Sequence, residues 1–266
     1  MIAETDLRLA ERAHYRLQSA LYIPFQQDLG NAKLCWSDVI DDTEWNHVGL
    51  VDVAPEDCDR LLLEAGRLLT ERGRAPAVAI SPFSTPADLS KRLTAQGFHP
   101  AFEHSWLFYP AKAAGIVSPS YEKIYPLGTE DLGDFVRVFN TTFGAEEEPG
   151  FALAIQESVT ESPAGLEVVH FLATWDGVPV GISTLIHDGE VGGLYNLGVV
   201  PAARRQGLGR RLTLWRVREA RRRGCRLIFL QTEKSAVERW QKNAGFVPGF
   251  SVQGWSQVVK DGISPA

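Results

Sequence analysis

Cysteine, metal-ligand clusters and long apolar runs are all scarce in this sequence. Its 266 residues include three cysteines, Cys35, Cys58 and Cys225, without a C-x-x-C pair. An odd number of widely spaced cysteines argues against a disulfide framework and a cysteine-based zinc site, so no metal site is expected. No apolar run approaches the ~20 residues that a membrane helix needs, and no signal-peptide segment follows the polar N-terminus. These absences predict a cytoplasmic protein without a membrane partner.

An excess of basic residues is also lacking. Lys plus Arg number 27 against 33 Asp plus Glu, for a net charge of −6. This balance argues against a general nucleic-acid binder. Hydrophobic residues make up 44% and charged residues 23%, which is ordinary globular composition and excludes a wholly disordered chain. The length fits one large domain or two small ones.

The second half of the sequence reads as alternating strands and helices. Asp176-Gly177 and Asp188-Gly189 each separate two apolar runs, a pattern typical of type I′ hairpin turns, so a three-strand meander is expected over about 168–200. Helical spacing of Leu208, Leu212 and Trp215 then predicts a helix. The remaining expected elements are a strand at 121–125, a helix from Thr129, a loop at 146–150, a helix at 208–223, a strand at 227–230, a helix at 235–244 and a strand at 250–259.

A similar series occurs in the first half. The run G-F-x-P-x-F begins at Gly97 and again at Gly245, 148 residues later. Before each run comes the same coarse order of strand, helix, glycine, strand and helix, at 45–53, 56–72, 73, 77–80 and 87–96 in the first half. The order predicts an internal repeat of a whole domain.

One motif carries chemistry. Arg204-Arg205-Gln206-Gly207-Leu208-Gly209 lies between an expected strand and an expected helix. Glycine lets a backbone approach a ligand closely, and the first N–H groups of a helix have no partner within it and attract anions. The turn is therefore suited to a pyrophosphate. It is not a P-loop, because G-K-[ST] is absent, and its strands are hairpin-linked rather than part of a βαβ unit.

The run from Val199 to Gly209 resembles motif A of the GNAT acyltransferase superfamily. The preceding hairpins and the following helix-Gly-Phe-strand series resemble that family too, over roughly residues 121–260. The resemblance implies an α/β fold of the α+β type, with two tandem GNAT-like domains, each a mixed, mostly antiparallel sheet with flanking helices. The expected division is a degenerate domain at 1–112, a linker at 113–120 and an acyltransferase domain at 121–266.

The resemblance also implies acetyl-CoA as co-substrate. Its pantetheine arm would pair with the strand at 197–199, its pyrophosphate would bind the N–H groups of 205–210, and the N–H of Val199 would stabilise the oxyanion. The residues expected to contact the cofactor are Leu197, Gly198, Val199, Arg204, Arg205, Gln206, Gly207, Leu208, Gly209, Arg210 and Ser235.

The acid and base usual in the family are missing. Many members carry a Tyr where this sequence has Gln241, and some carry a Glu where it has Gly193. The substitutes nearest to the motif are Tyr195, Asn196 and Glu190. Of these we favour Tyr195 as the residue that faces the cleft, because it shares a strand face with 193 and 197.

The first half departs from the motif at the equivalent turn, 53–59, which has acidic residues and no glycine. This half is expected not to bind CoA there.

The leading hypothesis is an acetyl-CoA-dependent N-acetyltransferase in which a primary amine attacks directly in a ternary complex, and the protein is a monomer or homodimer. Alternatives are a non-catalytic acyl-CoA sensing module and, through ten arginines at 204–226, a nucleic-acid binder.

Overall fold

The computed structural model describes residues 2–110 and 123–257, so the expected linker at 113–120 lies outside them. The chain forms two compact units that do not follow the sequence in simple order. Unit 1 contains Met1–Leu21 and Trp106–Gly249, and unit 2 contains Tyr22–Ser105 and Phe250–Ala266. In the described part of the chain, no helix is both long and apolar enough to cross a membrane.

Unit 1 is built on a mixed sheet whose strand order is β5-β10-β9-β8-β7-β6, where only the end of β5, from Trp106 to Phe108, belongs to this unit. The three-strand meander is present and its first turn is as expected, with Asp176 and Gly177 both at positive φ. After the meander, β10 joins parallel to β9. The strands are β5 (His99–Phe108), β6 (Lys123–Pro126), β7 (Glu167–Trp175), β8 (Val178–His187), β9 (Val191–Val199) and β10 (Leu227–Thr232).

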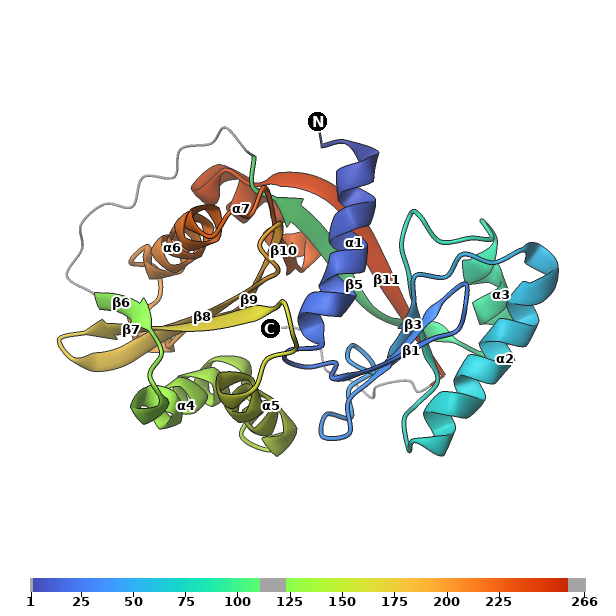
Figure 1. Ribbon diagram of the computed structural model, residues 1–266, viewed down its shortest axis with the longest axis horizontal. Helices are drawn as coiled ribbons and strands as arrows, with labels where there is room; N and C mark the ends of the chain where they lie inside the picture. Colours follow the sequence, from blue (N-terminus) through green and yellow to red (C-terminus); the bar gives the residue numbers. More distant parts are fainter. Residues whose placement is uncertain (1, 111–122, 258–266) are drawn as a thin grey trace. The chain divides into compact units, whose positions relative to one another are not determined.

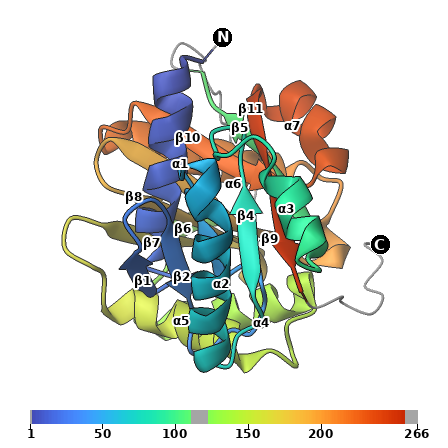
Figure 2. The same cartoon turned by 90° about the vertical axis from the view of Figure 1, so that its right-hand side faces the viewer.

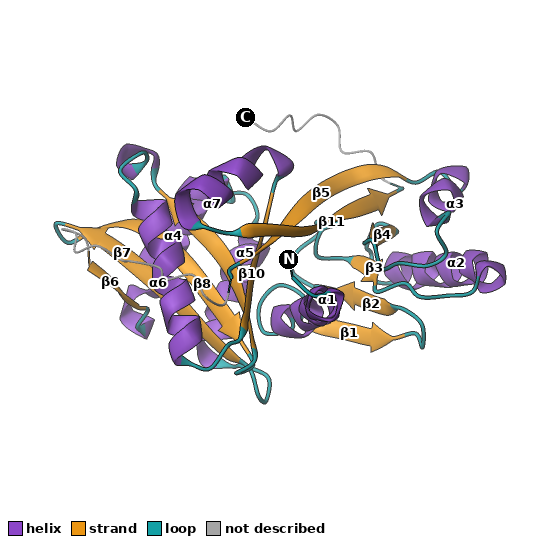
Figure 3. Ribbon diagram, turned by 90° about the horizontal axis from the view of Figure 1, so that it is seen from above, coloured by secondary structure: helices purple, strands orange, loops and turns teal. Residues whose placement is uncertain are grey.

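Helices cover both faces of this sheet (Figure 1, and from above in Figure 3). α6 and α7 lie on one face and α4 and α5 on the other, while α1 contacts β8, β9 and β10. The helices are α1 (Glu4–Gln18), α4 (Leu132–Phe143), α5 (Pro149–Thr160), α6 (Leu208–Arg222) and α7 (Val237–Ala244), with short 3-10 turns at Thr129–Asp131, Pro201–Ala203 and Lys234–Ala236.

Unit 2 has the strand order β1-β2-β3-β4-β11. Buried leucines of α2 and α3 pack on these strands to form its core, and Figure 2 shows both helices in front of β4. The elements are β1 (Phe25–Asp28), β2 (Lys33–Trp36), β3 (His47–Gly49), α2 (Pro55–Glu71), β4 (Ala77–Ile80), α3 (Leu89–Ala95) and β11 (Val247–Ser256).

The two halves share local geometry as the repeat predicts. β3 pairs parallel with β4, as β9 pairs with β10. Gly97 and Gly245 both take left-handed φ values, +81° and +76°, at the ends of α3 and α7, and a buried Phe follows each. The last strands are exchanged: β11 pairs with β4 in unit 2, and Tyr109, just after β5, donates its N–H to Ile228 of β10 in unit 1.

Several local expectations need correction. Only Gly189 has positive φ in the second Asp-Gly turn. There Asp188 lies opposite Val191, so the turn residues are Gly189 and Glu190, and the Asp188 carboxylate accepts the N–H groups of Glu190 and Val191. The expected loop at 146–150 ends early, because Pro149 begins α5. α1 was not expected, and the strand at 45–53 is limited to β3.

Candidate active site

The strands β9 and β10 separate towards their carboxyl ends. Their parallel pairing runs from Val191 opposite Leu227 to Leu194 opposite Leu230. Both strands continue further, β9 to Val199 and β10 to Thr232, but the described residues show no pairing between these last parts. β9 meanwhile stays paired with β8 as far as Val199. An unpaired strand edge offers N–H and C=O groups to an extended ligand.

The glycine turn follows directly after this edge. Gly207 has φ +81° and serves as the N-cap of α6, and Gly209 lies in the first turn of that helix. In the described part of the chain, no acceptor is found for the N–H groups of Leu208, Gly209 and Arg210. A Cβ placed on Gly209 would have only Leu197 and Val199 nearby, each at 3.9 Å. The helix terminus is thus open to an anion on the side of the β9 edge.

The arginines of the turn mostly hold its own backbone. Arg204 Nε donates to the Val199 carbonyl at 3.0 Å, and Arg211 donates to the Gln206 carbonyl at 3.0 Å. Arg210 donates to the Asn243 carbonyl, which ties α6 to the end of α7. Arg205 takes a positive φ of +63° and is exposed. The backbone therefore supplies most of the open hydrogen-bond donors of this turn, with Arg205 the arginine left to add charge.

Comparison with known proteins identifies this arrangement. Residues 133–246 match the acetyltransferase (GNAT) family model. This part of the chain is a GNAT acetyltransferase domain. The match runs from the start of α4 through α5, the meander, the glycine turn, α6 and β10 to α7, and leaves α1 outside.

Solved structures share the fold over most of the chain. A GCN5-related N-acetyltransferase from Kribbella flavida is 20% identical with a TM-score of 0.69, covering 93% of this chain and 95% of its own. A tandem GNAT protein from the clavulanic acid biosynthesis pathway is 17% identical with a TM-score of 0.61, covering 86% and 79%. Mycothiol acetyltransferase from Nocardia farcinica is 35% identical over 150 residues. That alignment spans 50% of this chain and 46% of the relative, so the chain matches about half the length of this curated relative.

Tyr195 of the GNAT domain lies on the strand face of Gly193, as expected. Its ring covers that glycine, and its hydroxyl oxygen is 2.5 Å from where a Cβ of residue 193 would lie. The side chain is buried, and burial raises its pKa far above the ordinary value. Its hydroxyl is 3.1 Å from Nδ1 of His14 on α1. Tyr195 therefore faces helix α1.

Asn196 marks an irregularity in β9. Its φ of +52° coincides with a register shift against β8, and its side-chain N–H donates to the Thr184 hydroxyl at 3.2 Å. Thr184 in turn is 2.8 Å from Nδ1 of His170, whose Nε2 is 2.9 Å from the Ser158 hydroxyl. This buried chain links α5, β7, β8 and β9. Asn196 thus holds the strand in shape beside the point where β9 and β10 part.

A buried arginine fixes the same irregularity from α6. Arg216 is 1% exposed and donates to the carbonyls of Tyr195, at 2.8 Å, and Thr184, at 3.2 Å. Burial lowers its pKa to about 9, so the side chain is still a cation at neutral pH. The sequence placed Trp215 on the apolar face of this helix, but Arg216 lies deeper, in line with the buried Leu212.

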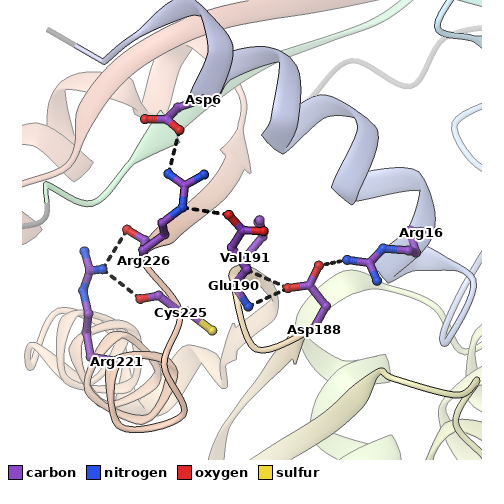
Figure 4. Close-up of polar contacts among 8 residues, drawn as sticks. All are labelled: Asp6, Arg16, Asp188, Glu190, Val191, Arg221, Cys225 and Arg226. Carbon is purple, nitrogen blue, oxygen red and sulfur yellow. Dashed lines mark hydrogen bonds and ion pairs between the residues drawn. The ribbon is translucent and has the colours of Figure 1, made fainter.

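Glu190 must be removed from the candidate catalytic residues. It stands just before β9, whereas Val199 is the last residue of that strand, roughly 30 Å away at the usual rise of a strand. Its carboxylate pairs with Arg226 at 2.8 Å. Arg226 also pairs with Asp6, and Arg16 pairs with Asp188 (Figure 4). Glu190 therefore belongs to the contacts that hold α1 on unit 1.

The other predicted positions are less informative about binding. Ser235 lies outside α7, which begins two residues later, and the Ser235 hydroxyl donates to the Glu233 carboxylate. Several arginines at 204–226 hold protein groups. Arg221 binds the carbonyls of Cys225 and Arg226 (Figure 4), and Arg223 pairs with Glu167. Much of the arginine-rich stretch thus serves to cap and anchor α6.

Residue-by-residue reading of the sequence missed His14, Ser158, His170, Thr184 and Arg216. The signal for Arg216 was available, because Leu208, Leu212, Arg216 and Ala220 repeat every four residues and all are buried. His14 could have been found only as part of an amphipathic helix, from the spacing of Ala10, His14 and Leu17. Its distance of 181 residues from Tyr195 gives no sequence signal of their contact.

Proposed function

We propose that the chain is an acetyl-CoA-dependent N-acetyltransferase acting on a primary amine. The observation that carries this proposal is the unpaired end of β9 followed directly by the open N-terminus of α6. An extended pantetheine-like arm requires the strand edge, and a pyrophosphate requires the helix terminus. Both features lie in the GNAT domain, in the order that such a co-substrate needs.

Different residues of the chain have separate roles in this reaction. The N–H groups of Leu208, Gly209 and Arg210 bind the pyrophosphate, and Leu197 to Val199 align the arm. The N–H of Val199 polarises the thioester carbonyl. The amine nitrogen then bonds to the carbonyl carbon, the C–S bond breaks, and free CoA leaves as the thiol. Acetyl transfer by this route needs no covalent enzyme intermediate.

The acceptor is inferred to be a small amine. The similarity to a mycothiol acetyltransferase supports a mycothiol-type amine as the first compound to examine. Other small amines, aminoglycoside-type antibiotics, peptide N-termini and protein lysines complete the panel.

The decisive experiment is calorimetric titration with acetyl-CoA of the wild type, Gly209→Glu and Gly209→Gln. Position 209 has room for a side chain and no positive φ, whereas any residue at 207 would strain the backbone. A carboxylate at 209 repels the pyrophosphate, so the affinity of Gly209→Glu for acetyl-CoA is expected to fall about 100-fold, or about 2.7 kcal/mol. The neutral Gln variant, of similar size, should lose far less.

Equal affinity in all three proteins would refute the placement of the cofactor. Acetyl-CoA binding without thiol release by any amine of the panel would favour a sensing module, consistent with Gly193 and Gln241 at the positions of the family's usual base and acid. No binding of acetyl-CoA, together with salt-sensitive binding of nucleic acid, would favour the arginine-helix alternative.

A further inference from the structure

His14 and Tyr195 form a polar pair in an aromatic environment. The Tyr195 hydroxyl and Nδ1 of His14 are 3.1 Å apart. The His14 ring meets Trp106 edge-on, with ring centroids 5.1 Å apart, and Phe229 of β10 lies 6.3 Å away. Phe229 is paired with Gly193, just before the two strands separate. The pair therefore lies at the start of the unpaired edge.

The absence of a side chain at position 193 leaves room for the Tyr195 ring and so for its contact with His14. Because residue 193 is glycine, the Tyr195 ring folds back over it, and the hydroxyl occupies space that a side chain there would fill. The fully buried Gln18 adjoins the same hydroxyl from α1. Helix α1 thus presents the polar side chains of His14 and Gln18 to this point of β9.

Burial keeps Tyr195 protonated at neutral pH, since its pKa lies far above the ordinary value. A protonated hydroxyl can donate its hydrogen to an imidazole nitrogen that carries none. Nδ1 of a neutral His14 is such an acceptor when the ring proton is on Nε2.

We propose that His14 and Tyr195 together take up the proton that the amine loses, a role that rests on the proposed acetyl transfer. When the nitrogen has bonded to the carbonyl carbon, it carries one proton too many. The Tyr195 hydroxyl lies over Gly193, about 20 Å along β9 from Val199, so the proton reaches its oxygen through waters along the unpaired strand edge, while the hydroxyl's own proton moves to Nδ1 of His14. The imidazolium returns the proton to solvent, and the leaving thiolate takes one up from solvent. A helix from the start of the chain thereby supplies the base.

A purely structural role would be to fix α1 on unit 1, but other groups do this. Arg226 pairs with both Asp6 and Glu190, and Arg16 pairs with Asp188 (Figure 4). These contacts can be broken without touching His14. They therefore provide a control in which α1 is loosened while the pair is kept.

The test uses His14→Asn, Tyr195→Phe and the double variant in the full chain. Asparagine places a polar atom near Nδ1 but cannot take up a proton. With the amine that gives the fastest thiol release from acetyl-CoA, each single variant is expected to lower kcat about 100-fold. The double variant should lose no more than either single one, because the two residues act as a unit. Acetyl-CoA affinity and thermal midpoint should stay near those of the wild type.

Arg226→Gln is the matched control, and we expect it to lower the thermal midpoint and leave kcat unchanged. A second readout is independent of activity: the ¹⁵N signals of His14 should show an unprotonated Nδ1 in the wild type and change in Tyr195→Phe.

An active wild type with unimpaired His14→Asn would overturn the relay and leave the proposed function intact. Equal losses of kcat, acetyl-CoA affinity and stability in the variants would mean a structural role for the pair and would also overturn the relay. A wild type that binds acetyl-CoA but acetylates no amine would overturn both proposals. A protonated Nδ1 in the wild type would overturn the relay alone.

Discussion

Residues 121–266 expressed alone are expected to remain unfolded, although sequence analysis marks them as the acyltransferase domain. The fragment lacks two parts of unit 1, which are α1 and the segment from Trp106 to Tyr109. Leu107 and Tyr109 belong to the core cluster that also contains Leu194 and Ile228. Without these parts, the Ile228 carbonyl of β10 loses the hydrogen bond that it accepts from the Tyr109 N–H.

The magnitude of the loss decides the outcome. Large side chains of the missing parts are almost fully buried: Tyr15, Leu17, Trp106, Leu107, Phe108 and Tyr109. Burying such a side chain contributes about 1.5–3 kcal/mol, so their joint removal costs about 10 kcal/mol or more. A typical domain has a net stability of about 5–15 kcal/mol. The deletion therefore removes most or all of the stability of unit 1.

The measurement is the dispersion of amide signals in an NMR spectrum of the fragment, together with its thermal unfolding. Co-expression with residues 1–110 is the control, because the two pieces together restore both missing parts of the unit. A cooperative transition and acetyl-CoA binding by 121–266 alone would show that the expected domain boundary is the correct one.

Local signals predicted most elements of the GNAT domain. The Asp176-Gly177 turn, the apolar face of α6 and the glycine after α7 are each encoded within a few residues. The second hairpin turn was predicted wrongly because Asp188 uses its carboxylate to bind two backbone N–H groups, and this side-chain interaction overrides the dipeptide preference.

Long-range pairings could not be predicted in this way. The exchange of β5 and β11 between the units depends on which strand edges meet, and two copies of one repeat offer similar edges. The glycine turn before α6 was predictable because its residues are contiguous in sequence. The partner of Tyr195 was not, since His14 is 181 residues away.

Acid is expected to destabilise the GNAT domain through His170. Burial lowers the pKa of this histidine from 6.5 to about 4, and its two ring nitrogens face the hydroxyls of Ser158 and Thr184. The unfolded chain therefore binds more protons than the folded one between pH 6.5 and 4, so stability falls as the pH is lowered through this window. The full effect is about 3 kcal/mol, since a pKa difference of one corresponds to about 1.36 kcal/mol.

Denaturant unfolding at pH 7 and pH 4 measures this effect in the wild type and His170→Gln. Glutamine can keep a hydrogen bond to Ser158 but does not titrate. The stability of the His170→Gln protein is therefore expected to fall about 3 kcal/mol less than that of the wild type between the two pH values.

His47 of unit 2, whose pKa is also lowered to about 4 by burial, should contribute a similar decline to both the wild type and His170→Gln. His47→Gln is therefore the matched control: its unit 2 transition should lose the acid sensitivity while that of unit 1 keeps it. An equal decline in the wild type and His170→Gln would show that His170 gains its proton without cost, and that the chain from Ser158 to Asn196 adapts to the charge.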